Sequence, residues 1–324
     1  MSRDISLDTI REAASIIYDV VRRTPLVRLD VPGMADDGPD IFLKLETLQP
    51  IGSFKIRGAY NAVRHLPKEQ LARGVWTVSA GNAAQGVALA ARTVGASCSV
   101  MVMDTAPATK LRSIENLGAT IVKAPYDECW RTVEQHASDR MNGQFVHPFD
   151  DDRFISGNGT IGLEIVEDLP DVDAVIAPLG GGGLLAGVAA ALRELSPRVT
   201  IYAAEPETAS PLSLSFEAGR PSVFPQWTAS FVDGAGGRSV LPSMWPLLRE
   251  LVTESLVVTL DEAARAMKTV AERVHVIMEG AAACAVAAAM SPRFATHGHR
   301  KVVAVVSGGN IDLARFAQLT GSCT

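Results

Sequence analysis

The sequence lacks both a hydrophobic run long enough to cross a membrane and the apolar core of a secretion signal. Its longest apolar stretch, residues 281–290, is far shorter than the roughly 20 residues that a spanning helix needs. The first 21 residues carry charges throughout, unlike a signal peptide. We therefore expect a cytoplasmic protein that does not enter a membrane.

Basic residues and cysteines are also scarce. Among 324 residues, Lys and Arg number 30 against 36 Asp and Glu, which gives a net charge of −6. There is thus no basic surplus with which to bind nucleic acid. The four cysteines are scattered, without a CxxC pair: Cys98, Cys129, Cys284 and Cys323. This spacing favours free thiols in a reducing compartment over a disulfide framework.

The sequence does contain a regular alternation of short β-branched runs and helical patterns. Strands are predicted at 41–46, 75–79, 99–103, 120–124, 174–178, 199–205, 255–260 and 301–307. Helices are predicted at 55–66, 82–94, 107–117, 127–141, 155–168, 184–195, 261–276 and 279–290, with Asp261 as the N-cap of the helix at 261–276. The pattern predicts an α/β protein whose mostly parallel sheets are covered by helices on both faces. In such folds ligands bind at the carboxyl ends of the strands.

A run of four glycines, Gly180 to Gly183, lies between a predicted strand and a predicted helix. Bare backbone amides at a helix N-terminus can bind phosphate, although such a run can also be only a tight turn. Gly181, Gly183 and Ala186 match the GxGxxA pattern of dinucleotide-binding proteins, and Glu205 ends the next strand, where a ribose-binding acid is expected. An NAD-dependent oxidoreductase is therefore one hypothesis, but it gives no role to three other motifs.

These three motifs also follow strands. Lys55, in GSFKIRGA, is either a surface lysine whose stem lies along a helix or a partly buried amine with a lowered pKa that acts as a nucleophile. The loop SAGN, Ser79 to Asn82, either binds a carboxylate at a helix N-terminus or is simply a capped helix start. Ser307 ends the last strand, in SGGN. A lysine, a phosphate loop and an anion loop together indicate pyridoxal phosphate acting as an electron sink for an amino-acid substrate.

Nine segments, in order along the chain, resemble the fold type II pyridoxal-phosphate enzymes, in the branch of threonine and serine dehydratases and serine racemase. They are RRTPLVRL, LKLETLQPIGSFKIRGAYNA, SAGNAAQGVALAA, APATKLRSIENLGA, HPFDD, GNGTIGLEI, PLGGGGLLAGVA, DGAGG and SGGN. The resemblance implies a tryptophan synthase β-like fold of two doubly wound domains and a homodimer. The large cofactor-binding domain would comprise 1–71 and 151–324, and a smaller mobile domain 72–150.

The resemblance also implies roles for individual residues. Lys55 would hold the cofactor aldehyde covalently and act as acid and base at the substrate α-carbon, and Ser307 would face the pyridine nitrogen. The cofactor phosphate would bind to the amides of Gly180, Gly181, Gly182, Gly183 and Leu184. Further cofactor contacts would come from Phe54, Asn82, Gly234 and Glu279, and the substrate would bind to Ser79, Ala80, Gly81 and Asn82. His147, in HPFDD, is expected to be structural.

Ala80 separates two activities of the branch. Serine racemases resemble SSGN at this loop, and the second serine supplies the acid/base opposite the lysine, whereas Ala80 has no transferable proton. The resemblance therefore implies elimination of water from threonine or serine, giving a 2-oxo acid and ammonia. Ala83 and Asn158 depart from the family pattern and leave open 3-hydroxyaspartate, a hydroxyectoine-type catabolite, or serine racemisation. Pro211 stands where the cation loop that begins at Glu205 has its second carboxylate, so no tightly bound metal is predicted.

Overall fold

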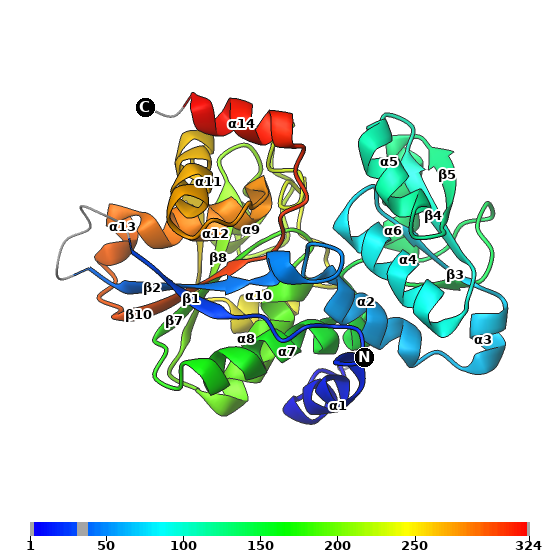
Figure 1. Cartoon of the computed structure of the whole chain (residues 1–324), viewed down its shortest axis with the longest axis horizontal. Coiled ribbons are helices and arrows are strands. Elements are labelled where there is room, and N and C mark those ends of the chain that lie inside the picture. Colours follow the sequence, from blue (N-terminus) through cyan, green and yellow to red (C-terminus); the bar gives the residue numbers. More distant parts are fainter. Residues whose placement is uncertain (1–2, 31–37, 323–324) are drawn as a thin grey trace.

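The computed structural model describes residues 3–30 and 38–322, which form two sheets flanked by helices (Figure 1). Strand order in the larger sheet is β1 (Leu26–Leu29), β2 (Asp40–Leu45), β10 (Lys301–Val306), β7 (Ala174–Pro178), β8 (Thr200–Pro206) and β9 (Glu254–Val258). Strand order in the smaller sheet is β5 (Thr120–Ala124), β4 (Cys98–Met103), β3 (Val75–Val78) and β6 (Gln144–Phe145). All neighbours are parallel except β1 and β2. This arrangement confirms the predicted α/β class.

Helices cover both faces of the larger sheet. The helices before β7 are α1 (Leu7–Ile17), α2 (Lys55–Arg64), α3 (Lys68–Ala72), α4 (Asn82–Val94), α5 (Ala108–Glu115), α6 (Tyr126–Gln135) and α7 (Asp152–Asp168), with a 3-10 turn η1 (Glu46–Leu48). Those after it are α8 (Gly183–Leu195), α9 (Pro211–Ala218), α10 (Trp245–Leu251), α11 (Leu260–Arg273), α12 (Gly280–Met290), α13 (Pro292–Ala295) and α14 (Leu313–Gly321).

The central strands are apolar on both sides because each side has its own core. In β7, Val175 and Ala177 pack into one core together with α7 and α8. Ala174 and Ile176 face the opposite core, which contains α11 and α12. Successive side chains of a strand point to opposite faces. A strand with helices on both sides therefore reads as a continuous apolar run rather than an alternating one.

The predicted strands all form, with ends shifted by at most a few residues. The helix predicted at 127–141 is shorter, because His136 has a left-handed backbone (φ 56°) that ends α6 at Gln135. The helix predicted at 155–168 starts earlier, because the Asp151 carboxylate accepts a hydrogen bond from the Phe154 amide and caps it. The prediction did not include β1 and β6, which have four and two residues.

Asp261 is not the N-cap that the sequence predicted. Helix α11 begins one residue earlier and its N-cap is Thr259. The Thr259 hydroxyl accepts from the Glu262 amide, and the Glu262 carboxylate accepts from the Thr259 amide, which completes a capping box. This reciprocal pair satisfies both the Glu262 amide of the first turn and the Thr259 amide that precedes the helix.

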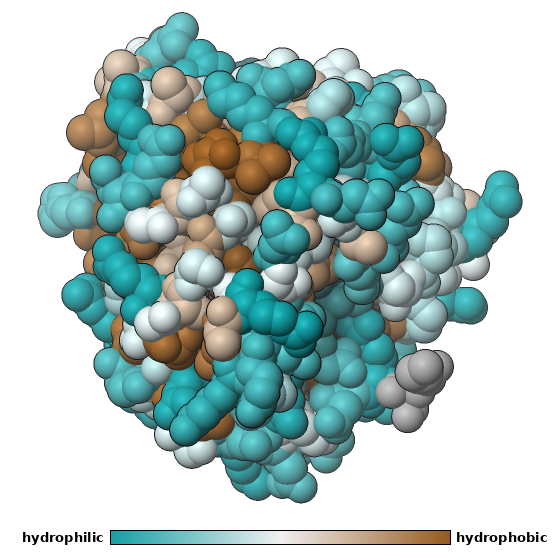
Figure 2. Space-filling view, turned by 90° about the vertical axis from the view of Figure 1, so that its right-hand side faces the viewer, coloured by the Kyte–Doolittle hydropathy of each residue, from teal (hydrophilic) through white to brown (hydrophobic). Residues whose placement is uncertain are grey.

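Three of the predicted free thiols are confirmed: Cys98, Cys129 and Cys284 are unpaired and buried. Cys323 lies outside the described residues. No helix within residues 3–30 and 38–322 has the length and apolarity to span a bilayer. Figure 2 shows the face that lies at the right in Figure 1, where α3 to α6 are found; hydrophilic side chains predominate there, with separate apolar patches between them.

The order of strands decides where the candidate motifs meet. Strand β10 is the last in the sequence, yet it lies between β2 and β7. The loop to Lys55 follows β2, the glycine run follows β7, and Ser307 follows β10. Because the three strands are parallel, their carboxyl ends lie at one edge of the sheet. Three motifs separated by more than a hundred residues are thereby placed next to each other.

Candidate active site

Lys55 is the first residue of α2, and its amine lies in an apolar, hydrogen-bonded position. The Nζ atom donates to the Pro148 carbonyl oxygen at 2.6 Å. It lies 5.2 Å from the ring centre of Phe54 and 5.4 Å from that of Phe154. Burial lowers the pKa of Lys55 to about 8, and the nearby Glu279 only partly opposes this effect. Roughly a tenth of the molecules then carry an uncharged, nucleophilic amine at neutral pH. Of the two sequence-based interpretations, the structure favours the partly buried amine.

The segment before Lys55 is joined directly to the end of β10. Ser53 and Gly308 form an isolated antiparallel bridge. The Phe54 amide donates to the Ser307 carbonyl oxygen at 3.0 Å. The Ser307 side chain is almost fully buried, and none of the described residues forms a hydrogen bond with its hydroxyl. These contacts place Ser307 beside the lysine segment, with a hydroxyl that is available to a ligand.

At the first, second and fourth positions of the run, a neighbouring group leaves no space for a side chain. A Cβ on Gly180 would lie 2.7 Å from the Gly234 carbonyl oxygen, one on Gly181 2.1 Å from Cγ of Phe149, and one on Gly183 2.5 Å from the Phe149 carbonyl oxygen. Gly182 has a left-handed backbone (φ 92°) and is the N-cap of α8, with no side-chain cap. The N–H groups at the start of α8 are therefore not capped by a side chain, in a bend that only glycine can form.

A polar network connects the two sheets beside the lysine. The Asn82 amide nitrogen donates to the Glu279 carboxylate at 2.7 Å, and its Oδ1 accepts from Asn310 at 2.7 Å. Burial, together with Asp233, raises the pKa of Glu279 to about 8. Gly234 packs between Gly180 and the helix that Glu279 precedes. The predicted contact residues Asn82, Gly234 and Glu279 are thus adjacent to one another.

The loop Ser79–Asn82 leads from β3 into α4. The Ser79 hydroxyl accepts from the Gly81 amide at 3.1 Å, and the N-cap Gly81 provides no side-chain cap. A Cβ added to Gly81 would meet no protein atom within 4 Å. The start of this 13-residue helix therefore faces open space, and its dipole and first N–H groups favour an anion there.

Glu205 does not serve the role that the dinucleotide hypothesis requires. Its carboxylate is buried and accepts from the amides of Leu212 and Ser213 and from the hydroxyl of Ser255. Burial raises the pKa of Glu205 to about 7 despite these donors. A carboxylate that holds the first turn of α9 is not available to a ribose, so the oxidoreductase hypothesis is wrong on this point. The same contacts favour the predicted absence of a tightly bound cation, which stays a prediction.

Sequence reasoning assigned no role to two groups that contact the site. The first is the turn Pro148–Phe149, which touches both Lys55 and the glycine run. The second is Asn158, whose amide nitrogen donates to the Gly183 carbonyl oxygen at 3.1 Å from within α7. No local pattern indicates either contact, because each joins residues that are at least 25 positions apart.

The smaller sheet is also tied to the larger one at the mouth of this region. Lys110 of α5 forms an ion pair with Asp233. The Arg238 guanidinium lies 4.5 Å from the ring centre of Tyr126 and 4.2 Å from that of Trp227. Such cation–π contacts are favourable by about 0.5–1 kcal/mol each at exposed sites. They hold α5 and α6 against the loop that carries Gly234.

The residues at this edge fit pyridoxal phosphate. The uncapped N-terminus of α8, preceded by glycines, suits a phosphate. The amine of Lys55, whose pKa burial lowers, suits an aldehyde. The free hydroxyl of Ser307 offers a partner to a ring nitrogen, and the open space at Gly81 suits a substrate carboxylate.

Comparison with known proteins agrees with this geometry. The family model of pyridoxal-phosphate dependent enzymes matches residues 17–308. An L-threonine ammonia-lyase of Thermotoga maritima is 39% identical over 95% of this chain and 76% of its own, and a catabolic L-threonine dehydratase of Staphylococcus aureus is 37% identical over 97% and 91%. The structure of maize serine racemase superposes with a TM-score of 0.88 at 35% identity, over 97% of this chain and 96% of the other. By sequence, fold and site, the chain belongs to the fold type II pyridoxal-phosphate dependent enzymes, and pyridoxal 5′-phosphate is its cofactor.

Proposed function

We propose that this protein is a lyase that eliminates water from a 3-hydroxy amino acid, threonine or serine, and yields a 2-oxo acid and ammonia. The names of the two relatives from Thermotoga maritima and Staphylococcus aureus support this reaction. The observation that carries the proposal is the partly buried amine of Lys55, which donates at 2.6 Å to the turn that also contacts the glycine run. It supplies a base at the place where an amino acid must lose its α-proton.

In this proposal Lys55 removes the α-proton and the loop Ser79–Asn82 binds the substrate carboxylate. When bound, the cofactor withdraws electrons from the α-carbon of the substrate, so that its proton can be removed. The Nζ atom of Lys55 takes this proton, and its lowered pKa makes the uncharged form accessible near neutral pH. The free N–H groups at the start of α4 hold the substrate carboxylate, which fixes the α-carbon relative to the amine.

The network around Asn82 keeps this loop in place. Asn82 is held from both sides, by Glu279 and by Asn310. Since Asn310 also donates to the Ile51 carbonyl oxygen at 2.7 Å, the carboxylate loop is linked to the segment that carries the lysine. We propose that this linkage aligns substrate and base, and that the smaller domain (72–150) closes on the larger one through the Lys110–Asp233 ion pair.

Ala80 favours elimination over racemisation, although a serine racemase is among the similar structures. Racemisation requires a proton donor on the face opposite Lys55, and a methyl group at position 80 cannot donate one. The hypotheses of 3-hydroxyaspartate or a hydroxyectoine-type substrate have no such supporting contact. We further propose that the protein works as a homodimer in the cytoplasm, as the family resemblance and the unpaired, buried thiols suggest.

Substitution of the lysine tests the proposal. Lys55→Ala is expected to abolish ammonia release from threonine and serine, because the only proposed base is gone. The yellow absorbance expected of a cofactor bound to a lysine, which borohydride bleaches, should also be lost, because the attachment point is gone. Lys123→Ala, at an exposed lysine of β5, serves as the control and should retain both. Turnover by Lys55→Ala comparable to that of the wild type would refute the assignment.

A further inference from the structure

The turn from His147 to Asp150 contacts both halves of the cofactor site. The Pro148 carbonyl oxygen accepts from the amine of Lys55 at 2.6 Å. The next residue, Phe149, fills the space beside the glycine run: its ring lies where a Cβ on Gly181 would be, and its carbonyl oxygen lies where one on Gly183 would be. A shift of this turn would therefore disturb the lysine and the phosphate loop together.

One imidazole holds this turn. Nδ1 of His147 lies 3.2 Å from the Phe149 amide nitrogen and 2.7 Å from the Asp150 amide nitrogen. Both partners are N–H donors, so Nδ1 must be the acceptor, and the ring proton is on Nε2. Nε2 in turn donates to the Val133 carbonyl oxygen at 3.2 Å. Through these hydrogen bonds the ring connects the turn to Val133, near the end of helix α6.

The surroundings of His147 keep its ring uncharged. Burial lowers the pKa of His147 to about 3, and the neighbouring His136 and Lys55 act in the same direction, against Asp150 and the Val133 carbonyl. An uncharged ring can accept the two amides at neutral pH. The ring also packs edge-on against Phe149, with 4.6 Å between the ring centres.

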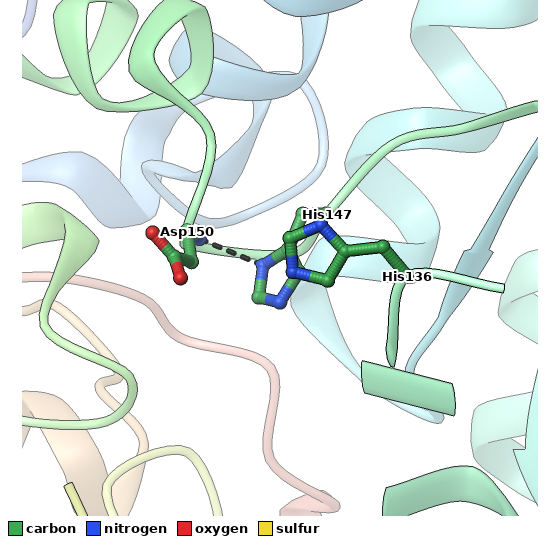
Figure 3. Close-up of side chains that lie close together, drawn as sticks. All are labelled: His136, His147 and Asp150. Carbon is green, nitrogen blue, oxygen red and sulfur yellow. Dashed lines mark hydrogen bonds between the residues drawn. The ribbon is translucent and has the colours of Figure 1, made fainter. Parts of the chain in front are cut away.

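A metal site is the obvious alternative for this cluster. Figure 3 shows His136 and His147 close together, with the backbone amide of Asp150 pointing to the His147 ring. Suitable ligand atoms of the three residues lie within 4.8 Å of one another. However, both nitrogens of His147 are already hydrogen-bonded, and the Asp150 carboxylate accepts from Arg3 and from Ser243. A metal ion could bind only by breaking contacts that hold the turn.

We propose that His147 is a positioning residue of the cofactor site: by accepting the Phe149 and Asp150 amides, it holds the turn that meets Lys55 and covers the glycine run. The inference rests on the proposed function, because it assumes that the cofactor binds at this edge. The hydrogen-bond partners of the His147 ring are the backbone groups of Val133, Phe149 and Asp150, and it forms no hydrogen bond with Lys55, so we assign it an indirect role through the turn. Its loss should weaken cofactor binding and leave the substrate carboxylate loop, which lies in a different segment, unaffected.

Two substitutions at position 147 distinguish the contribution of the hydrogen-bond acceptor from that of the ring's packing. His147→Phe keeps a flat ring but leaves the two buried amides without an acceptor, whereas His147→Asn keeps an acceptor that can bond the amides two and three residues ahead. With the full-length chain we expect the dissociation constant for pyridoxal phosphate to rise about tenfold or more in His147→Phe and to stay within about threefold of wild type in His147→Asn. At saturating cofactor, the KM for threonine should be unchanged in both.

Hydrogen exchange and a neighbouring variant complete the test. Amide exchange of the peptide 146–152 should become faster in His147→Phe and not in His147→Asn. His136→Ala should retain wild-type cofactor affinity. Wild-type affinity in His147→Phe would overturn the inference, as would an equal loss in His136→Ala and His147→Phe that Zn²⁺ reverses, which would indicate a metal site. A wild-type protein that binds no pyridoxal phosphate would instead refute the proposed function.

Discussion

Gly81 offers the sharpest test of where the substrate binds. It precedes α4 with φ −131° and ψ −139°, just outside the extended region that other residues prefer, and a Cβ added there would meet no protein atom within 4 Å. Gly81→Ala should therefore meet no neighbouring side chain, and its cost to the fold is limited to local backbone strain. The added methyl group would extend into the open space that we assign to the substrate carboxylate.

The magnitudes of the two effects differ enough to be separated. Alanine is a poorer N-cap than glycine by roughly 0.5–1 kcal/mol, but it reduces the entropy of the unfolded chain by a similar amount. Backbone strain at ψ −139° adds about 1 kcal/mol, so the free energy of unfolding should fall by about 1 kcal/mol. Displacing the carboxylate from one N–H group would cost about 1.5–3 kcal/mol. This corresponds to a fall of about 10- to 150-fold in kcat/KM for threonine.

Gly162→Ala is the matched control, because the same methyl group meets protein there, within α7 and outside the proposed contacts of cofactor and substrate. Its Cβ would lie 2.8 Å from Cβ of Ala191 and 3.0 Å from the Val188 carbonyl oxygen, and overpacking of this kind costs about 1–3 kcal/mol. Thermal unfolding and steady-state ammonia release, measured on both variants, separate the outcomes. If Gly81→Ala retained wild-type kcat/KM, no part of the substrate would occupy that space, and the assignment of the carboxylate loop would be wrong.

Three other perturbations have defined outcomes. Ala80→Ser should raise the ratio of serine racemisation to pyruvate formation, since it adds a proton donor opposite the lysine; brisk racemisation by the wild type would contradict this use of Ala80. EDTA should change neither activity nor melting temperature, because the oxygens of Glu205 already accept hydrogen bonds; a loss that Mg²⁺ restores would show otherwise. Burial alone would raise the pKa of Glu164, but Arg57 and Lys44 lower it from 4.5 to about 2. About 3 kcal/mol of stability, fully present above pH 4.5, should then be lost as the pH falls towards 2. Acid unfolding of Glu164→Gln should lack this dependence.

The predictions that held rest on local patterns. The strands and most helices follow from apolar periodicity, which depends on neighbours in the sequence. The glycine run and Lys55 are recognisable as candidates because each follows a predicted strand, where ligands bind in such folds. One local signal failed: Asp261 has the side chain of an N-cap, but α11 already begins at Leu260, and Thr259 is its N-cap.

Glu205 illustrates what a pattern cannot decide. Its position at the end of a strand suited both a ribose-binding acid and a cation ligand. Its actual partners are two amides of α9 and a serine of β9, up to 50 residues away. Only the packing of these elements shows that the carboxylate is already occupied.

By itself, the sequence determined the α/β class, the positions of the strands and the identities of the lysine, glycine and serine motifs, because these depend on residues close together in the chain. The tertiary structure alone decided that β10 lies between β2 and β7 and that the turn at His147 lies against both Lys55 and the glycine run. The physical reason is that the order of strands in a parallel sheet is set by packing and crossover connections between distant segments. That order places the chemical groups of this site within reach of one another.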